Sequence, residues 1–400
     1  MVGSTKYDVV IVGGFGHVGL PLAISLADKG KQVCALDINA SAMETIGAGE
    51  MPFWEDGAEE ALCRVLKSGK LTLSLEASDI SATDTVVFII GTPVDRHLNP
   101  EFEPMRAVIE SYLPHFRDGQ LVVLRSTVFP GMTEKMRGWM RAAGKQVELA
   151  FCPERIAEGF AMKELEALPQ IVSSFSDEGV ARARALFETL TREIITVPPI
   201  EAELAKLFSN TWRYIKFAAA NQFFMLANDH GADFYRIHHA MTTHYPRCAD
   251  LPKPGFAAGP CLFKDSMQLA ALNNGNFYMG HSAMLVNEGL PNYVVSMVKR
   301  KHDLRDKTCG ILGMAFKANI DDKRESLSYK LKKILLFESR EVLCSDTHFD
   351  EAGFVSTEEL IRRCDVIIVG APHREYKNLQ IPSGKILVDV WNMNGNGCVI

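Results

Sequence analysis

Short runs of apolar residues alternate with longer segments of helical spacing in the first part of the chain. The runs are bounded by glycine, aspartate or polar turn residues, and this pattern predicts buried strands. The predicted strands are Val9–Val12, Val33–Leu36, Val86–Ile90, Leu121–Leu124 and Val147–Phe151. Helical spacing fills the intervals, for example over Val18–Lys29. Strands that alternate with helices indicate a parallel, doubly wound sheet with helices on both faces.

The pattern changes after Pro198 and Pro199. Residues 201–230 contain no glycine or proline, carry apolar side chains at helical spacing, and end before Gly231. This predicts one long helix that a glycine C-cap terminates. Helical segments with loops continue to about Arg300.

Alternating strands and helices return in the last part of the chain. The predicted elements are strands at Cys309–Leu312, Val342–Cys344, Val366–Val369 and Ile386–Val388, and helices at Ser326–Phe337 and Thr357–Arg363. We therefore predict an α/β protein with two Rossmann-like doubly wound domains, joined by a long central helix and a helical region. The expected boundaries are 1–197, 198–300 and 301–400. In each α/β domain an early strand is followed by a glycine turn and the next ends near an aspartate, Asp37 or Asp346.

Length and charge exclude several classes of protein. The 400 residues are 47% hydrophobic and 23% charged, which is typical of a globular protein too long for one core. The formal net charge of −6 argues against the broad basic surface of a nucleic-acid binder. No stretch reaches the ~20 apolar residues of a membrane-spanning helix, and Val9–Val12 is too short for a signal-peptide core. We therefore expect a cytoplasmic protein with no membrane or nucleic-acid partner.

Cysteine and histidine usage gives little indication of a metal site. The nine cysteines form no C-x-x-C pair, which argues against a disulfide framework or zinc site. His238, His239 and His244 cluster without the spacing of a metal site, so no metal is expected.

A glycine-rich motif follows the first predicted strand and opens a helix. It consists of Gly14, Phe15, Gly16, His17, Val18 and Gly19. Such a turn brings backbone close to a pyrophosphate at a helix N-terminus. Asp37 ends the next strand, where a carboxylate accepts hydrogen bonds from a ribose and repels a 2′-phosphate. The sequence therefore predicts NAD rather than NADP as the cofactor, and a glycine turn that serves only packing is the alternative.

Further motifs follow in a fixed order. They are Ser126–Gly131, Pro153–Gly159, Glu203–Asn210, Pro254–Asp265, Gly313–Lys317 and Asp321–Arg324. Together these motifs closely resemble those of the UDP-glucose/GDP-mannose 6-dehydrogenase family over nearly the whole chain. The resemblance implies NAD-dependent, four-electron oxidation of the C6 alcohol of a nucleotide sugar to a uronic acid.

The resemblance also implies catalytic roles. Cys261 is the implied nucleophile, which traps the aldehyde as a thiohemiacetal and later carries a thioester. Lys206 and Asn210 lie four residues apart and share a helix face that Arg213 continues; the resemblance assigns the first two to stabilising the C6 oxyanion. Asp265 is implied to orient this network. The resemblance makes Glu154 the base for thioester hydrolysis, and Thr127 the residue that positions a water.

Binding roles are implied in the same way. Further cofactor contacts are expected from Thr92, Glu158, Lys264 and Arg324. Substrate contacts are expected from Arg155, Arg213, Arg247, Gly255, Phe256 and Lys317, because a diphosphate requires fixed positive charge. In the family the arginine at the position of Arg247 sometimes reaches the substrate across a subunit interface, and a homodimer built on the long helix is expected.

The chain departs from the family pattern at the cysteine loop. Ala257, Ala258, Gly259 and Pro260 precede Cys261, where the family usually has Gly-Gly-Ser or Gly-Gly-His. Pro260 has no N–H and stiffens this approach. Arg155 replaces the phenylalanine that is common at this position in the UDP-glucose enzymes of the family. Arg155, Asn210–Arg213 and Thr243–Arg247 look more like the N-acetylhexosamine branch.

Several alternatives stay open at this point. The sugar is a UDP-linked hexose or N-acetylhexosamine, and a role in polysaccharide biosynthesis is expected. The rival functions are a two-electron 3-hydroxyacid-type dehydrogenase and a non-catalytic nucleotide-sugar-binding protein.

Overall fold

The computed structural model describes residues 5–91, 101–257, 259–273, 276–398 and 400. The chain divides into two compact units, residues 1–208 and 209–400. We describe each unit by itself. The three-domain division with boundaries at 197 and 300 stays a prediction.

The first unit contains a sheet of strand order β3-β2-β1-β4-β5-β6-β7-β8. Neighbouring strands are parallel except β6 and β7, which are antiparallel. The strands are β1 (Val9–Val12), β2 (Val33–Leu36), β3 (Leu71–Ser74), β4 (Thr85–Phe88), β5 (Leu121–Leu124), β6 (Glu148–Phe151), β7 (Gln170–Ser174) and β8 (Ile194–Thr196). The predicted strands are thus present, whereas β3, β7 and β8 were not predicted.

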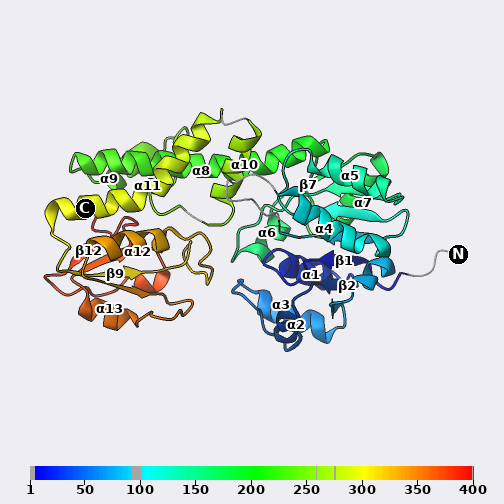
Figure 1. The fold of residues 1–400 in the computed structure, drawn as a ribbon, viewed down its shortest axis with the longest axis horizontal. Coiled ribbons are helices and arrows are strands. Elements are labelled where there is room, and N and C mark those ends of the chain that lie inside the picture. The colour runs from blue at the N-terminus through cyan, green and yellow to red at the C-terminus, as the bar shows by residue number, and fades with distance from the viewer. Residues whose placement is uncertain (1–4, 92–100, 258, 274–275, 399) are drawn as a thin grey trace. The chain divides into compact units, whose positions relative to one another are not determined.

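Helices cover both faces of this sheet (Figure 1). The central strands are buried throughout, and successive side chains enter two separate cores. One core packs against α1 (Gly19–Asp28), α3 (Ala58–Lys67) and α7 (Asp177–Phe187). The other packs against α4 (Phe102–Tyr112) and α5 (Met132–Ala142). The remaining helical elements are α2 (Ala40–Gly47), α6 (Ala161–Ala167), η1 (Ala77–Ala82) and η2 (Leu113–His115). The doubly wound arrangement is confirmed.

The long predicted helix is α8 (Pro199–Asp229). Proline is well tolerated at its start, because the first N–H groups of a helix have no intrahelical partner. Gly231 terminates it in the left-handed region, at φ +66°. Gly231 N–H donates to Asn228 C=O at 2.9 Å and Ala232 N–H donates to Ala227 C=O at 2.8 Å, which is the glycine C-cap that the sequence predicts.

The second unit contains a parallel sheet of strand order β10-β9-β11-β12. Its strands are β9 (Thr308–Leu312), β10 (Glu341–Ser345), β11 (Val366–Val369) and β12 (Ile386–Val388). Its other helices are α9 (Phe234–Thr242), α10 (Leu262–Leu272), α11 (Tyr278–Lys301), α12 (Leu327–Glu338), α13 (Thr357–Arg363) and η3 (Arg374–Tyr376). One core joins the sheet to α12, α11 and the end of α8, and a second joins it to α13 (Figure 1).

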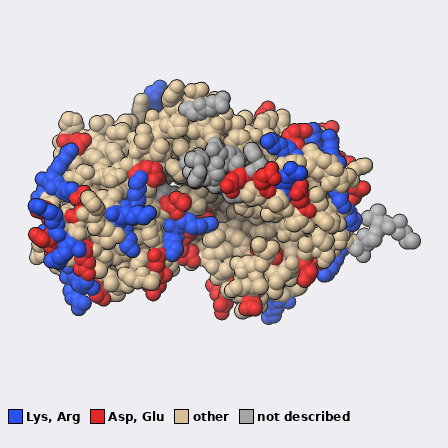
Figure 2. Space-filling model, in the orientation of Figure 1, with Lys and Arg blue, Asp and Glu red and all other residues tan. Residues whose placement is uncertain are grey.

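The surface agrees with the composition. On the face shown in Figure 2, lysine and arginine side chains lie interspersed with aspartate and glutamate. The ion pairs among the described residues include Lys299–Glu338 and Lys323–Glu351. Among the described residues, no helix is long and apolar enough to cross a membrane.

Candidate active site

The glycine-rich turn between β1 and α1 is fixed by packing. Gly13 adopts φ +78°, and a methyl group there would lie 1.8 Å from the carbonyl oxygen of Ile89. A methyl group on Gly19 would lie 2.1 Å from Gly13 C=O, and one on Gly14 would lie 2.8 Å from Ala35. Only glycine therefore allows the strand, the turn and the helix to approach one another this closely.

Gly16 is a different case. A methyl group there would lie 3.8 Å from the nearest protein atom, so the protein itself leaves space at this position. In a dinucleotide-binding turn this glycine lets the pyrophosphate approach the backbone. The residues present therefore fit NAD, with Gly16 facing the site and Gly14 and Gly19 shaping the turn.

Asp37 completes the turn at the end of β2. Its carboxylate accepts N–H groups of Phe15 at 3.1 Å, Ile38 at 2.8 Å and Asn39 at 3.2 Å. The half-buried carboxylate thus lies beside the glycine turn, where the sequence predicts a ribose contact.

The other predicted cofactor residues of the first unit differ in their surroundings. The Phe15 side chain is buried in the core, so only its backbone can reach a ligand. The His17 ring stacks on Phe53, with ring centroids 4.1 Å apart. Val18 and Glu158 are half-buried. Thr92 lies outside the described residues.

Glu154 lies in a buried polar network at the end of β6. One carboxylate oxygen pairs with the Arg125 guanidinium, and the other accepts the N–H groups of Arg155 at 2.7 Å and Ile156 at 3.0 Å. Arg125 also donates to Gln170 Oε1 at 3.0 Å and stacks 4.6 Å above the Phe187 ring. Glu154 is only 6% exposed and Arg125 is fully buried, so the network holds the carboxylate in one orientation.

Thr127 follows β5 and is half-buried. The segment after it is anchored to α8 by buried Glu203, whose carboxylate accepts Gly131 N–H at 2.6 Å and Thr133 N–H at 2.8 Å. This anchor caps the start of α5, where a negative charge is favourable.

The second unit brings three predicted catalytic residues together. The Asn210 amide on α8 donates to Asp265 Oδ2 at 2.6 Å, and both side chains are buried. Cys261 occupies the N-cap of α10, one turn before Asp265, and its side chain is exposed. Cys261 and Asp265 are four residues, about one helical turn, apart, and Cys261 is exposed whereas Asp265 is fully buried. A helix N-terminus also favours the anionic thiolate that nucleophilic chemistry requires.

Lys206 lies one turn before Asn210 on α8 and is 9% exposed. Arg213, which the sequence places on the same face, is exposed instead. The buried face of α8 beyond Asn210 continues through Thr211 and Tyr214. Arg213 is thus separate from the buried Lys206 and Asn210 side chains.

The loop before Cys261 is held from two sides. Asn221 of α8 accepts Gly255 N–H at 2.8 Å and donates to Gly255 C=O at 3.0 Å. On the other side, a methyl group at Gly255 would lie 2.1 Å from the Trp391 ring. Phe256 is buried edge-on to the same ring, with centroids 6.4 Å apart. Gly255 and Phe256, both expected to bind substrate, therefore also fasten the loop.

The predicted cationic residues have varied partners. Arg324 is fastened to Asp322 through Nε, at 3.0 and 2.8 Å from the two carboxylate oxygens. Arg155 donates to Pro169 C=O, and burial lowers its pKa. Arg247 is exposed and lies 5.8 Å from the Tyr245 ring. Lys264 and Lys317 are half-buried.

The remaining cysteines serve mostly as packing groups. Six of them are buried, Cys248 is half-buried and Cys63 is exposed. Burial raises the pKa of several of these thiols, for example Cys152 and Cys34, each to about 12. A raised pKa suppresses the thiolate, so these side chains are poor nucleophiles.

The second unit repeats the turn of the first with different chemistry. Gly313 adopts φ +88°, and Asp346 at the end of β10 accepts Met314 N–H at 2.6 Å and Ala315 N–H at 3.1 Å. Here, however, the carboxylate is buried and pairs with His373 Nε2 at 3.1 Å. Asn319 N–H donates to His373 Nδ1 at 2.9 Å, so Nε2 carries the proton. The similarity between Asp37 and Asp346 therefore lies in the backbone turn, because the Asp346 carboxylate is already paired with His373.

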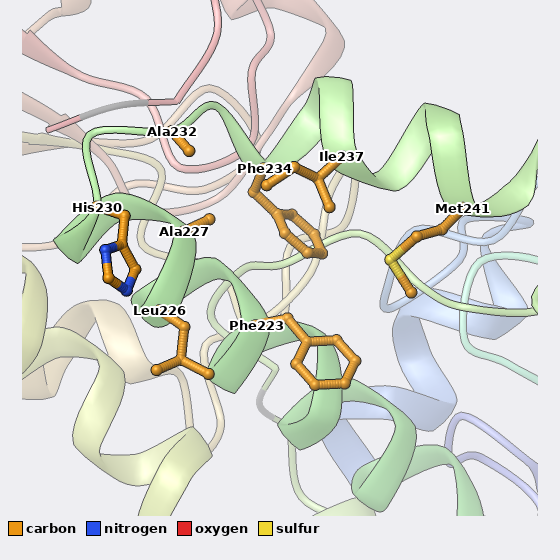
Figure 3. Close-up of a pocket in the computed structure, with 8 residues that line it drawn as sticks. All are labelled: Phe223, Leu226, Ala227, His230, Ala232, Phe234, Ile237 and Met241. Carbon is orange, nitrogen blue, oxygen red and sulfur yellow. The ribbon is translucent and has the colours of Figure 1, made fainter.

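An apolar groove lies between α8 and α9 (Figure 3). Phe223 and Leu226 extend from α8, and Phe234, Ile237 and Met241 extend from α9. Phe223 is 43% exposed and Leu226 is 51% exposed. Exposed apolar patches of this kind mark interaction surfaces.

Sequence reasoning missed the residues that hold these loops. Arg125 directly follows the apolar run of β5, and a charge at the end of a buried strand could have been recognised as a site residue. Asn221 gives no comparable indication, because an amide on a long helix usually faces solvent. His373 lies far from Asp346 in sequence, so only the fold reveals the pair.

The chain matches all three models of one family. These are the NAD-binding domain of the UDP-glucose/GDP-mannose dehydrogenase family over residues 8–191, its central domain over 200–288 and its UDP-binding domain over 310–396. The three matches cover most of the chain in the expected order.

Individual proteins are also similar over almost their whole length. A UDP-N-acetyl-D-mannosamine dehydrogenase of Salmonella typhi is 30% identical, over 93% of this chain and 95% of the relative. The solved structure of a UDP-D-ManNAc dehydrogenase from Pyrococcus horikoshii has a TM-score of 0.90 at 26% identity, over 98% of this chain and 97% of that one. A UDP-glucose dehydrogenase from Pyrobaculum islandicum has a TM-score of 0.88 at 27% identity, over 97% and 95% of the two chains.

Proposed function

Because the chain belongs to the UDP-glucose/GDP-mannose dehydrogenase family and carries its NAD-binding domain, we propose that it oxidises the C6 alcohol of a UDP-linked N-acetylhexosamine to a uronic acid. The reaction removes four electrons and forms two NADH per sugar. The observation that carries the proposal is the hydrogen bond between Asn210 and Asp265, one helical turn from Cys261.

NAD, when bound, accepts a hydride in each of the two oxidations. The first unit holds it through the backbone of the glycine turn at Gly16 and through the Asp37 carboxylate. The carboxylate would repel the 2′-phosphate of NADP, which makes NAD the cofactor of choice.

Oxidation of the alcohol requires stabilisation of negative charge at the C6 oxygen. Lys206 supplies a buried positive charge, and the Asn210 amide supplies a hydrogen bond donor. Asp265 fixes the orientation of that amide through the 2.6 Å hydrogen bond. We assign these three residues to the first step.

Oxidation of the aldehyde requires a tetrahedral carbon that can lose hydride. The Cys261 sulfur adds to the aldehyde carbon and the carbonyl oxygen takes a proton, which gives a thiohemiacetal. Loss of a hydride and of the hydroxyl proton converts it to a thioester. Water then attacks the thioester carbonyl carbon and gives up a proton, the carbon–sulfur bond breaks with the Cys261 thiolate as leaving group, and the uronic acid is released. Glu154 is the proposed base for this water, and Thr127 is proposed to position it.

The choice of an N-acetylhexosamine rests on the relatives. The Salmonella typhi and Pyrococcus horikoshii proteins are named for UDP-N-acetyl-mannosamine, whereas the Pyrobaculum islandicum protein is named for UDP-glucose. Arg155, at a position where UDP-glucose enzymes commonly have phenylalanine, favours the first group. Lys317, Arg247 and Arg213 are proposed to meet the diphosphate or the sugar.

A substrate panel tests the proposal. The purified protein is mixed with NAD and with UDP-N-acetylmannosamine, UDP-N-acetylglucosamine, UDP-glucose or GDP-mannose, and NADH absorbance is followed to completion. We expect two NADH per UDP-N-acetylmannosamine and the highest kcat/KM for that sugar. One NADH per sugar would favour a two-electron dehydrogenase, and nucleotide-sugar binding without NADH would favour a binding protein.

Replacement of the thiol tests the mechanism. In Cys261→Ser, the alcohol can still be oxidised but the aldehyde cannot be trapped as a thiohemiacetal, so NADH per sugar falls toward one and complete turnover falls by at least about 1,000-fold. Cys63→Ser, at another exposed cysteine, serves as the control and keeps two NADH per sugar. Full turnover by Cys261→Ser would contradict the mechanism.

We also propose that the protein forms a homodimer through α8. The exposed apolar side chains of the groove in Figure 3 support this, together with Trp212, which is 54% exposed on the same helix. A cytoplasmic location and a role in polysaccharide biosynthesis stay predictions.

A further inference from the structure

Asn221 is a fully buried side chain that hydrogen-bonds the loop before Cys261. We propose that Asn221 is a positioning residue, which sets the place of Cys261 and thereby acts on the second oxidation but not on the first. The inference rests on the proposed function and assigns a role to a fully buried side chain that hydrogen-bonds Gly255 and Asn287.

The Asn221 amide binds the loop as a neighbouring strand would. Its oxygen accepts Gly255 N–H at 2.8 Å and its nitrogen donates to Gly255 C=O at 3.0 Å. Both backbone groups of one residue are thus held by one side chain, which fixes the rotation of that peptide as well as its distance from α8. Cys261 follows six residues later, beyond Pro260, which stiffens the approach.

A second amide fixes the orientation of the first. Asn221 Nδ2 also donates to Asn287 Oδ1 at 2.9 Å, and Asn287 Nδ2 donates to Tyr214 C=O at 3.1 Å. Both asparagine side chains are fully buried. A rotated Asn221 amide would direct its N–H₂ at Gly255 N–H and leave buried groups unsatisfied, at a cost comparable to a lost hydrogen bond.

The opposite side of the loop is closed by aromatic rings. The Trp391 ring lies against Gly255, and its indole N–H donates to Val369 C=O at 3.2 Å, so the ring cannot turn away. Phe316 lies against Gly259, where a methyl group would come within 2.6 Å of the ring. The loop therefore lies between Asn221 and two aromatic rings. Loss of the Asn221 amide removes the hydrogen bonds that fix the distance between the loop and α8.

The two oxidations respond differently to such a shift. Both oxidations require the bound sugar, to which Gly255 and Phe256 are expected to contribute, so the two steps are compared with the sugar fully bound. In the proposed mechanism the first hydride removal uses the Lys206, Asn210 and Asp265 side chains but not the Cys261 sulfur. The second oxidation requires the Cys261 sulfur at bonding distance from the aldehyde carbon, and a displacement of about 1 Å costs about 100-fold in rate. A change confined to Asn221 should thus separate the two steps.

Asn221→Asp provides the sharpest test, because it keeps the shape and the acceptor for Gly255 N–H. It replaces the donor by an oxygen that faces Gly255 C=O and Asn287 Oδ1. Asn228→Ala is the matched control: Asn228 is another buried amide of α8, seven residues later, and contacts Tyr293 and Ile400 rather than the loop. In a single-turnover experiment, UDP-sugar at a concentration below that of the protein is mixed rapidly with the protein and excess NAD. The rates of the two phases of NADH formation are fitted separately.

We expect Asn221→Asp to slow the second phase by about 100-fold and to leave the first phase within about threefold, so that aldehyde accumulates. Asn228→Ala should slow neither phase selectively, whatever its melting temperature. Equal slowing of both phases in Asn221→Asp would overturn the inference, because a general loss of stability predicts that result. If Asn221→Asp does not fold, Asn287→Ala replaces it. This variant keeps the two hydrogen bonds between Asn221 and Gly255 but removes the one that fixes the orientation of the Asn221 amide. The ratio of the two phase rates is compared with wild type in the same way.

A second readout separates this inference from the proposed function. If wild-type protein forms fewer than two NADH per sugar, the proposed function fails. The position of the loop is then read from the rate at which iodoacetamide alkylates Cys261, followed by mass spectrometry. A rate altered in Asn221→Asp but not in Asn228→Ala supports the positioning role, and equal rates in all three proteins overturn it.

Discussion

At the scale of single residues, buried polar side chains hold the loops on which the proposed chemistry depends. Arg125 fixes Glu154 in the first unit, and Asn210 and Asp265 fix each other in the second. His373 fixes Asp346, which in turn holds the turn after β9. Each pair is almost fully removed from water, so each is costly to break on one side only.

The Arg125–Glu154 pair predicts a non-additive effect on stability. Arg125→Met leaves the Glu154 carboxylate buried without its cation, and we expect the free energy of unfolding to fall by about 3–5 kcal/mol. Arg125→Met combined with Glu154→Gln removes both charges and should recover part of that loss. Urea unfolding of the three proteins checks this. A double variant that is less stable than the single variant would contradict it.

The environment of Asp346 predicts that the free energy of unfolding depends on pH in the acid range. Burial alone would raise its pKa, but the hydrogen bond from His373 and the backbone N–H groups together lower it. A lowered folded-state pKa contributes stability that is present above the unfolded value of about 3.9 and is lost as pH falls through the folded value. Asp346→Asn should therefore lower the free energy of unfolding at pH 7 by about 1–3 kcal/mol.

The difference between Asp346→Asn and wild type should narrow as the pH falls below about 4. Urea unfolding at pH 7 and at pH 3.5 measures it. Asp306→Asn, at an exposed carboxyl, is the control and should match wild type at both values. A gap that widened in acid would show that Asp346 is protonated in the folded protein.

At the scale of elements, the glycine turn between β1 and α1 separates packing from binding. Gly19 faces the backbone of the turn at a distance that excludes any side chain, whereas Gly16 faces open space. The same motif thus contains one position that the fold requires and one that only a ligand would require.

Two alanine substitutions distinguish these positions. Gly16→Ala should leave the melting temperature within about 2 °C of wild type and weaken NAD binding by at least about tenfold, because the methyl group meets the pyrophosphate. Gly19→Ala should lower the melting temperature clearly, because its methyl group meets a backbone oxygen. Calorimetric titration with NAD and thermal unfolding measure the two effects, and the reverse order would refute the assignment.

The elements also show how far the sequence alone leads. Central strands are continuous apolar runs because both faces are buried, so β1, β2 and β5 have the predicted bounds. β8 is a short edge strand with exposed side chains, and apolar and polar residues alternate only over four positions in β3. The hydrophobic pattern of neither strand can therefore be told from that of a loop. The roles proposed for Cys261 and Asp265 come from local motifs, whereas the contact of Asn221 with the loop joins residues 34 apart in sequence and needs the fold.

At the scale of the whole molecule, the two units share a glycine turn and a strand-end aspartate, but the surroundings of the two carboxylates differ. The first keeps Asp37 accessible beside Gly16, and the second closes the equivalent carboxylate with His373. The repeated turn therefore does not indicate a second NAD site. The family models agree, since they assign NAD to residues 8–191 and UDP to residues 310–396.

The proposed homodimer gives a prediction at this scale. Leu226→Asp places a charge in the apolar groove of Figure 3, and we expect the protein to elute as a monomer in gel filtration. Phe337→Asp is the control, because Phe337 is 90% exposed at the end of α12 and lies outside the groove. A wild-type monomer, or an unchanged elution volume for Leu226→Asp, would rule out this interface.

The position of Trp391 near the end of the chain affects the order in which parts of the protein fold during synthesis. The residue follows the last strand, yet its ring closes one side of the loop at Gly255. On the ribosome, chains emerge at roughly 5–20 residues per second and N-terminal parts fold first. The cysteine loop is therefore synthesised well before the ring that confines it. A nascent chain stalled before residue 391 should have a complete glycine turn and a loop that is not yet fixed, so the surroundings of Cys261, the proposed nucleophile, are completed last.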